Sequence, residues 1–283
     1  MISKNRYLVL GTSGLMGFTL SLFLSKQPTI EVYGTYRSDS LKIKNLKLLK
    51  VNNLTEIKNL DKIIKKVRPK FIINCLSTNH VSSKLVDIID IFALIPRFLN
   101  DLSFKYNFKL INLSSDIVYG SKFNYYSKES DSPCLMNEYA VCKYLGEINS
   151  KNIINIRTSI YGHSFKYKKG LLDWFLLKKK CSIYTNYFFS GISNLELSKI
   201  IFSITNGNFH YGTYNIGSER ISKYNLLKKV MNIYEHFPEI NKEPNPKVDL
   251  SFSSNKFIKQ FNIKIASIDD QLSEVSTIYD QYK

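Results

Sequence analysis

The run Tyr7-Leu-Val-Leu-Gly11-Thr-Ser-Gly14-Leu-Met-Gly17 places a short apolar stretch directly before a loop with three glycines. The apolar stretch predicts a buried strand, and the apolar segment that follows, to about Ser25, predicts a helix. In such a unit Gly11 permits a tight turn, Gly14 a close approach to a pyrophosphate, and Gly17 close packing of helix on strand. The phosphates would lie at the helix N-terminus. The residues expected to line this dinucleotide site are Gly11, Thr12, Ser13, Gly14, Leu15, Met16 and Gly17.

Strands and helices alternate along the rest of the first half of the chain. Further strands are predicted at Ile30–Tyr36, Lys47–Val51, Lys70–Asn74, Phe108–Leu113 and Asn152–Arg157. Helices are predicted at Thr55–Val67, from about residue 82 to Tyr106 with a kink at Pro96, and around Tyr139. This order is typical of an α/β protein with a doubly wound parallel sheet, a Rossmann-like fold.

The regular alternation of predicted strands and helices ends after Gly162. Helices are expected at about 170–179, 194–204 and 222–234, a strand at Thr213–Gly217, and short apolar pieces at 257–263 and 268–279. This half is too irregular for a second sheet and is expected to form a lid over the cofactor face. We therefore expect a dinucleotide-binding domain over residues 1–162 and a smaller C-terminal substrate-binding region over 163–283, of which about 187–217 returns to the first sheet.

The end of the second predicted strand indicates which dinucleotide is bound. NAD sites usually carry an acidic residue there for the ribose 2′-hydroxyl, whereas this chain has Thr35, Tyr36 and Arg37. A guanidinium without a neighbouring carboxylate suits a 2′-phosphate, so NADPH is the expected cofactor and NADH the alternative. The competing interpretation is that Arg37 is one more surface cation. The loop at Asn74–Ser77, after the fourth strand, should pass under the cofactor.

Three polar residues later in the chain suggest carbonyl chemistry. Tyr139 and Lys143 are four apart and would project from one face of a helix, where an ammonium lowers the pKa of a phenol from about 10. Ser115 follows the apolar run that ends at Leu113, so it should lie at the carboxyl end of a strand, where open α/β sheets bind ligands. Together they could protonate a carbonyl oxygen while hydride reaches its carbon. The alternative interpretation is that Tyr139 is an aromatic side chain of the core and that Ser115 only caps the end of the sheet.

The amino-acid composition limits the classes of protein to which this chain could belong. The net charge of +17 can indicate nucleic acid or an anionic membrane, but the lysines are spread along all 283 residues and no nucleic-acid-binding module is visible. The densest cluster, Lys166–Lys180, could be a solvated helix face, the rim of a nucleotide-diphosphate pocket or a membrane patch. The scattered cysteines do not suggest zinc and fit a reducing cytoplasm. Neither a signal peptide nor a membrane span is expected.

Four motifs in this order resemble the extended short-chain dehydrogenase/reductases. They are the three-glycine loop, the run Ser114–Gly120, Tyr139-x3-Lys143 with Gly146-Glu147 after it, and Arg157-Thr-Ser-Ile-Tyr-Gly162. Within that superfamily the chain is most similar to the dTDP-4-dehydrorhamnose reductase group, whose Ser-Thr-Asp-Tyr-Val-Phe corresponds here to Ser114–Tyr119. The likeness covers residues 7 to about 230, and more faintly 253–263.

The resemblance assigns roles to matching residues. It implies that Ser115 hydrogen-bonds the substrate carbonyl, Tyr139 is the acid, and Lys143 tunes Tyr139 and holds the nicotinamide ribose. It also implies cofactor contacts at Asn53, Leu54, Cys75, Leu76 and Ser77, with the Asn53 oxygen accepting from the adenine amino group. Asp116 and His163 are candidate substrate contacts, although His163 could be a loop histidine satisfied by the protein. One departure is Phe92, where the family commonly has Asn.

The implied function is NAD(P)H-dependent reduction of a nucleotide-activated 4-keto-6-deoxy sugar, in surface-polysaccharide sugar biosynthesis. A nucleotide-sugar epimerase or epimerase/reductase is the first alternative. GDP-fucose synthase and its relatives carry a Cys just after the catalytic serine, whereas this chain has Asp116 and Ile117, so we expect reduction alone. A non-catalytic nucleotide-binding or nucleic-acid-binding protein is the second alternative. The oligomeric state stays open, with a homodimer among the options.

Overall fold

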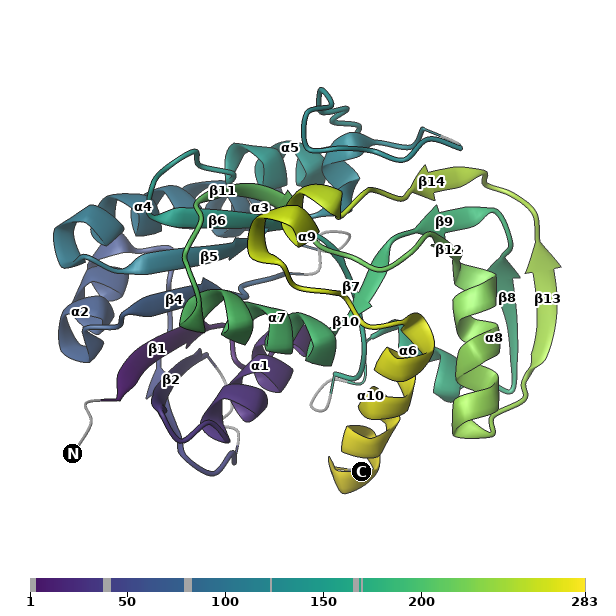
Figure 1. Cartoon of the computed structure of the whole chain (residues 1–283), viewed down its shortest axis with the longest axis horizontal. Helices are drawn as coiled ribbons and strands as arrows, with labels where there is room; N and C mark the ends of the chain where they lie inside the picture. Colours follow the sequence, from purple (N-terminus) through teal and green to yellow (C-terminus); the bar gives the residue numbers. More distant parts are fainter. Residues whose placement is uncertain are drawn as a thin grey trace.

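A seven-stranded parallel sheet forms the centre of the protein (Figure 1). The computed structural model describes residues 4–37, 42–78, 83–122, 124–164, 168 and 170–282, with side chains to residue 279. The strand order is β11-β6-β5-β4-β1-β2-β3, and every pairing is parallel. The strands are β1 (Asn5–Leu10), β2 (Ile30–Tyr36), β3 (Leu46–Lys50), β4 (Phe71–Asn74), β5 (Lys109–Leu113), β6 (Ile153–Arg157) and β11 (Gly212–Asn215).

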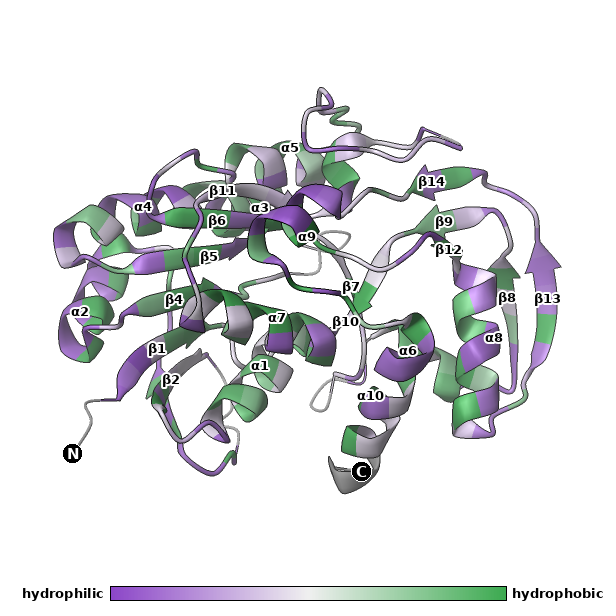
Figure 2. Cartoon of the chain, in the orientation of Figure 1, coloured by the Kyte–Doolittle hydropathy of each residue, from purple (hydrophilic) through white to green (hydrophobic). Residues whose placement is uncertain are grey.

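Helices cover both faces of this sheet. On one face α1 (Leu15–Ser25) packs beside α7 (Asn194–Asn206), and on the other α2 (Ile57–Val67) packs beside α4 (Ile95–Tyr106). Side chains alternate along β1, so Tyr7 and Val9 join the core under α1 and α7, while Leu8 and Leu10 join the core under α2 and α4. Two buried faces require apolar strands, and Figure 2 shows green, hydrophobic residues concentrated in strands such as β4. The predicted Rossmann-like α/β fold is confirmed.

Part of the second half of the chain returns to this sheet. Strand β11 pairs with β6, with Thr213 opposite Asn155 and Asn215 opposite Arg157. Helix α7 begins at Asn194, capped by the Ser193 hydroxyl, and lies against α1. The expected return of about 187–217 therefore includes one strand and one flanking helix of the central layer.

The expectation that residues beyond 162 form no second sheet is wrong. Strands β12, β9 and β14 form a three-stranded sheet, β13 pairs with β8, and β10 with β7. The bounds are β7 (Ser159–Tyr161), β8 (Lys180–Tyr184), β9 (Tyr187–Phe189), β10 (Gly191–Ser193), β12 (Ile221–Ser222), β13 (Glu239–Glu243) and β14 (Val248–Leu250). These strands are short, and β8 pairs with β13, which lies 59 residues later in the chain. A local sequence pattern therefore could not predict this pairing.

Helices complete this second region, which lies beside the carboxyl end of the central sheet in Figure 1. They are α6 (Leu171–Leu176), α8 (Lys223–Tyr234), α9 (Asn255–Phe261) and α10 (Ile268–Tyr282). Helix α10, where only short apolar pieces were expected, buries Leu272 and Val275 in the core of this region. Of the basic cluster at Lys166–Lys180, residues 166, 167 and 169 lie outside the described part. Among the described residues, no helix is long and apolar enough to cross a membrane.

The long helix before β5 contains a π-helical turn directly before the predicted kink position at Pro96. Helix α3 (Leu85–Ile89) continues through that turn (Asp90–Leu94) into α4. Pro96 has no N–H to offer the carbonyl of Phe92, four residues earlier. That carbonyl instead faces Gly146, where an added Cβ would lie 2.0 Å from the Phe92 oxygen. The π-turn therefore allows the end of α5 (Glu138–Leu145) to approach closely.

Candidate functional site

The three-glycine loop joins β1 to α1 as predicted. An added Cβ at Gly17 would lie 2.1 Å from the Gly11 carbonyl oxygen, so the helix can rest on the loop only because residue 17 is glycine. Helix α1 starts at Leu15 with Gly14 as its N-cap residue, and no side chain caps it. Its first N–H groups are the kind of site that binds phosphate.

Two side chains of this loop face inward. The Thr12 hydroxyl is buried and donates to the Thr35 carbonyl at 2.8 Å, and Met16 belongs to the core under α1. A dinucleotide could therefore meet Thr12 and Met16 only through their backbone. Ser13 and Leu15 are partly exposed. The loop is anchored to β2, the strand that precedes Arg37.

The other expected cofactor contacts follow neighbouring strands. Cys75 and Leu76 follow β4, and the Cys75 carbonyl oxygen lies 3.0 Å from where a Cβ on Gly11 would stand, so the two loops touch. Ser77 and Arg37 are both exposed, as a ligand contact requires. These loops and the α1 N-terminus surround one end of β1, which fits a dinucleotide.

The Asn53 side chain, the expected adenine contact, is exposed and already hydrogen-bonded within its own loop. The Asn53 side-chain oxygen already accepts from the Thr55 N–H at 2.9 Å and from the Thr55 hydroxyl at 2.7 Å. A carbonyl oxygen has two lone pairs, so both are used. An adenine amino group would have to displace the Thr55 hydroxyl. Leu54 is partly buried beside the core under α2.

Ser115, Tyr139 and Lys143 come together at the carboxyl end of β5. Ser115 caps a short 3-10 helix (Asp116–Tyr119), and its hydroxyl donates to the Asp116 carboxylate at 3.0 Å. Tyr139, in the first turn of α5, hydrogen-bonds Ser115. One helical turn later the Lys143 ammonium donates to the Leu113 carbonyl oxygen at 2.8 Å. Asn137 caps the N-terminus of α5, where its side-chain oxygen accepts a hydrogen bond from the Ala140 N–H.

The expected lowering of the Tyr139 pKa by Lys143 is not found. Burial raises the pKa of Tyr139 to about 12, the nearby Asp116 carboxylate adds to the rise, and the hydrogen bond with Ser115 opposes it. The Lys143 ammonium lies 5.9 Å from the centre of the Tyr139 ring and is directed to the β5 carbonyl. Tyr139 is therefore protonated at neutral pH, the form that an acid needs.

Lys143 itself is buried, and this changes its chemistry. Burial lowers the pKa of Lys143 to about 8, while the Glu147 carboxylate acts in the opposite direction. The ammonium is still mostly protonated at pH 7. Its position over the Phe92 ring, 4.3 Å from the ring centre, gives it a second favourable contact in this buried site.

Asp116 is the second ionisable group beside Ser115. Burial raises the pKa of Asp116 to about 6, against hydrogen bonds from Ser115 and Ser159 that lower it. The same carboxylate acts electrostatically on Tyr139, on Tyr187 in β9 and on Lys223 at the start of α8. Asp116 therefore lies between the residues of β5 and α5 and those of the second region.

Sequence reasoning missed Tyr187 and Lys223. The Lys223 ammonium lies 3.5 Å from the centre of the Tyr187 ring, and burial lowers the pKa of Lys223. Lys223 is the first residue of α8, where the helix dipole disfavours a cation. A half-buried ammonium in that place is suited to an anionic or strongly hydrogen-bonding ligand. Neither residue stands in a motif, because only the fold brings β9 and α8 to Asp116.

The candidate substrate contact at His163 is not supported. Its side chain is buried, with Nδ1 2.6 Å from the Asp173 carboxylate and Nε2 2.7 Å from the Tyr234 hydroxyl. The ring also stacks on Tyr279 at 3.9 Å. Both ring nitrogens are thus used inside the second region, and His163 joins α6, α8 and α10.

Comparisons with known proteins agree with this geometry. Residues 7–155, just over half of the chain, match the model of the NAD dependent epimerase/dehydratase family. No curated protein sequence matches the chain significantly.

Solved structures share the fold over nearly the whole chain. A hypothetical dTDP-4-dehydrorhamnose reductase from Sulfolobus tokodaii has a TM-score of 0.77 at 24% identity, covering 93% of this chain and 98% of that one. The dTDP-4-dehydrorhamnose reductase from Bacillus anthracis in complex with NADP has a TM-score of 0.80 at 20% identity, covering 97% and 98%. The dTDP-glucose 4,6-dehydratase from the same organism in complex with NAD has a TM-score of 0.81 at 17% identity, covering 98% and 97%.

The family match includes the glycine loop, Ser115, Tyr139 and Lys143, and it confirms the superfamily predicted from the four motifs. The chain belongs to the NAD dependent epimerase/dehydratase family.

Proposed function

We propose that the protein reduces the keto group of a nucleotide-linked 4-keto-6-deoxy sugar with NADPH. The observation that carries this proposal is the convergence of Ser115, Tyr139 and Lys143 next to the glycine loop, in a chain of a nicotinamide-dependent family. A hydroxyl, a protonated phenol and an ammonium are the groups that a carbonyl reduction needs.

The roles of these residues follow from their protonation. Tyr139, with its pKa raised to about 12, holds a proton that it can give to the carbonyl oxygen. Ser115 is placed to hydrogen-bond the same oxygen, and Lys143 supplies positive charge when the phenolate forms. When bound, the reduced nicotinamide supplies the hydride to the carbonyl carbon. One hydride and one proton convert the ketone to a secondary alcohol.

The second region offers a place for the nucleotide sugar. Lys223 on α8 and Tyr187 on β9 lie close enough to Asp116 for its carboxylate to affect their pKa values, as it affects that of Tyr139. The Lys223 ammonium also lies 3.5 Å from the centre of the Tyr187 ring. A diphosphate sugar is anionic and rich in hydroxyls, so an ammonium for the phosphates and a carboxylate for the hydroxyls suit it. Support for a 4-keto-6-deoxy sugar comes from the predicted resemblance, and the names of the Sulfolobus and Bacillus reductases are consistent with it.

The test is a screen of dTDP-, GDP-, UDP- and CDP-linked 4-keto-6-deoxy sugars for oxidation of NADPH, followed at 340 nm. Tyr139→Phe is the matched control, since it removes only the phenolic hydroxyl. Its turnover should fall by about 10²–10⁴-fold, the usual effect of losing a general acid, while NADPH binding stays near that of the wild type. No oxidation with any of these sugars, or undiminished turnover by Tyr139→Phe, would contradict the proposal.

The family description also names epimerases, so epimerisation is the second candidate. Asp116, with its pKa raised to about 6, is a carboxyl group that could exchange protons near neutral pH. We nevertheless propose reduction alone, because the Ser115 hydroxyl donates to this carboxylate and holds it in place. Turnover in heavy water separates the two: deuterium on the carbons flanking the keto group would show epimerisation.

A further inference from the structure

Three buried asparagines form a row across the central sheet. Asn74 on β4, Asn112 on β5 and Asn155 on β6 are opposite one another in the strand register. Their exposed fractions are 5%, 3% and 1%. Three amides buried in a sheet otherwise filled with Ile and Leu would be costly unless each were hydrogen-bonded.

Each amide in this row is satisfied, and the bonds run in one direction. Asn74 Nδ2 donates to Asn112 Oδ1 at 3.0 Å, and Asn112 Nδ2 donates to Asn155 Oδ1 at 3.2 Å. Asn155 Nδ2 donates to the Thr213 hydroxyl on β11 at 3.3 Å. Turning the Asn112 amide around would bring oxygen against oxygen at Asn155. The row therefore has a single favourable arrangement.

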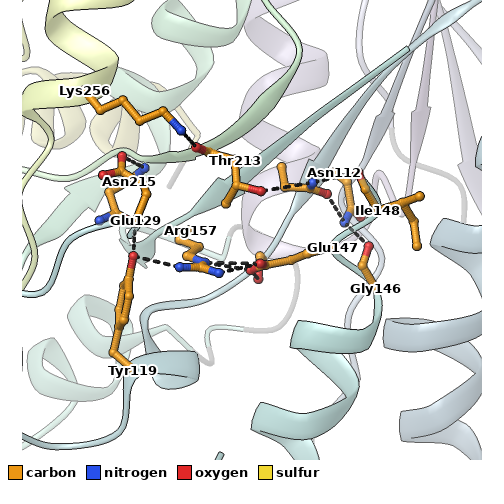
Figure 3. Close-up of polar contacts among 12 residues, drawn as sticks. Asn112, Tyr119, Glu129, Gly146, Glu147, Ile148, Arg157, Thr213, Asn215 and Lys256 are labelled. Atoms are coloured by element: carbon orange, nitrogen blue, oxygen red, sulfur yellow. Dashed lines mark hydrogen bonds and ion pairs between the residues drawn. The ribbon is translucent and has the colours of Figure 1, made fainter. Parts of the chain in front are cut away.

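The row also holds the segment that leaves the catalytic helix. Asn112 Nδ2 donates to the Gly146 carbonyl at 3.0 Å, and Asn155 Nδ2 donates to the Ile148 carbonyl at 3.1 Å. Figure 3 shows the Asn112 contact with Gly146, just beyond the end of α5. Between them the Glu147 carboxylate pairs with Arg157 at 2.7 Å. Three consecutive residues after α5 are thus fastened to β5 and β6.

Two further hydrogen bonds connect the asparagine row and Glu147 to the residues around the candidate site. At β4 the Asn74 side-chain oxygen accepts from the Leu76 N–H at 3.3 Å, in the loop that touches Gly11. Beside the row, Ser114 donates to Glu147 at 2.6 Å, directly before Ser115. The amides therefore link the loop expected to hold the cofactor to the helix that carries Tyr139 and Lys143.

We propose that Asn112, at the centre of this row, is a positioning residue that sets the catalytic helix relative to the cofactor loop. Asn112 acts on Tyr139 and Lys143 through its hydrogen bond to the Gly146 carbonyl, which sets the position of α5. This inference rests on the catalytic roles proposed for Tyr139 and Lys143.

The test compares Asn112→Ala with Asn152→Ala in the full-length protein. Asn152 is a matched control, because it is also buried and its side chain bonds Ser103 at 3.1 Å and Lys109 at 2.8 Å, but it lies at the other end of β6. Hydrogen exchange measured by mass spectrometry should be at least about tenfold faster over residues 138–148 in Asn112→Ala and unchanged there in Asn152→Ala.

Kinetics provide the readout that a merely structural role would not change. The groups facing Lys143 are Glu147, the Cys75 thiol, the Leu113 carbonyl and the rings of Phe92 and Tyr139. If the segment after α5 is released, Glu147 moves away and no longer supports the charged form of Lys143. For Asn112→Ala we expect a kcat at least about tenfold lower and a basic limb of the kcat–pH profile at lower pH. Asn152→Ala should keep the wild-type profile.

Equal exchange and equal pH profiles in the two variants would overturn the proposal. If Asn112→Ala does not fold, Asn112→Leu tests the same bond, since it keeps a side chain of similar size and removes the donor to the Gly146 carbonyl. The same faster exchange over residues 138–148 is expected, and exchange at the wild-type rate would contradict the proposal. If the wild type reduces none of the sugars screened, the proposed function fails separately. The exchange measurement then still decides whether the row holds the segment after α5.

Discussion

The Lys143 ammonium lies 4.3 Å from the centre of the Phe92 ring, and the same ring meets the Tyr139 ring edge-on at 5.1 Å between centres. Phe92 belongs to the π-helical turn before Pro96. An aromatic face is a favourable neighbour for a buried ammonium. Phe92 therefore provides a cation–π contact for Lys143, the lysine for which we propose a catalytic role.

Phe92→Leu should lower the pKa of Lys143 below its value of about 8, because the leucine keeps the apolar surroundings and removes the ring that favours the charged form. A desolvated cation–π contact contributes about 2 kcal/mol, so the basic limb of the kcat–pH profile should move down by about one unit or more. Phe98→Leu is the control, since Phe98 packs on the core under α2 and α4. An unchanged limb in Phe92→Leu would show that the ring does not stabilise the ammonium.

Asp116 should make the folded state less stable as pH rises. Its pKa is raised by burial to about 6, above the ordinary value of 3.8, so the folded protein binds the proton more tightly than the unfolded chain between these values. The stabilisation is full below about pH 4 and is lost as pH rises through about 6. Asp116→Asn should remove this loss, raising stability at pH 7 relative to pH 4 by up to roughly 3 kcal/mol.

The measurement is urea unfolding from pH 4 to pH 8. Asp61→Asn is a control of opposite sign, because hydrogen bonds from Lys105 and Tyr106 lower the pKa of Asp61. The Asp61 pair contributes stability that is present above the ordinary pKa of 3.8 and is lost only as pH falls through the lowered pKa. Asp61→Asn should therefore be less stable than the wild type by a nearly constant amount from pH 4 to pH 8. Parallel pH curves for Asp116→Asn and the wild type would contradict the raised pKa.

Arg37→Ala should weaken NADPH binding about 10- to 150-fold and leave NADH binding nearly unchanged. Arg37 is exposed directly after β2, and a charge-assisted hydrogen bond to the 2′-phosphate would contribute about 1.5–3 kcal/mol. Isothermal titration with each cofactor measures the effect, and Lys259→Ala removes an exposed cation on α9 as a control. Equal affinity of the wild type for the two cofactors would make Arg37 an ordinary surface residue.

Lys223→Met should raise KM for the nucleotide sugar about 10-fold or more without changing the Kd of NADPH. The ammonium, half-buried against Tyr187, is expected to face the sugar, and the dipole of α8 gives it no support there. Lys228→Met removes an exposed lysine of the same helix and should have no effect. If both variants keep the wild-type KM, Lys223 does not contact the substrate.

Local signals in the sequence were sufficient for the central layer. The apolar run at Tyr7–Leu10 and the glycines after it predicted β1, the loop and α1, because a buried parallel strand and a close helix approach each demand specific residue types within a few positions. Tyr139 and Lys143 were found in the same way, since four residues make one helical turn. The end of β5 likewise placed Ser115.

Tertiary structure alone decided the rest. The pairing of β8 with β13, the meeting of Lys223 and Tyr187 with Asp116, and the burial of His163 all join residues far apart in the chain. The pKa values of Tyr139 and Lys143 also depend on the tertiary structure, because burial is the main cause of both shifts. The spacing of residues on a helix shows which groups are neighbours, whereas burial depends on all the elements packed around them. Here burial shifts both pKa values more than the neighbouring charges do.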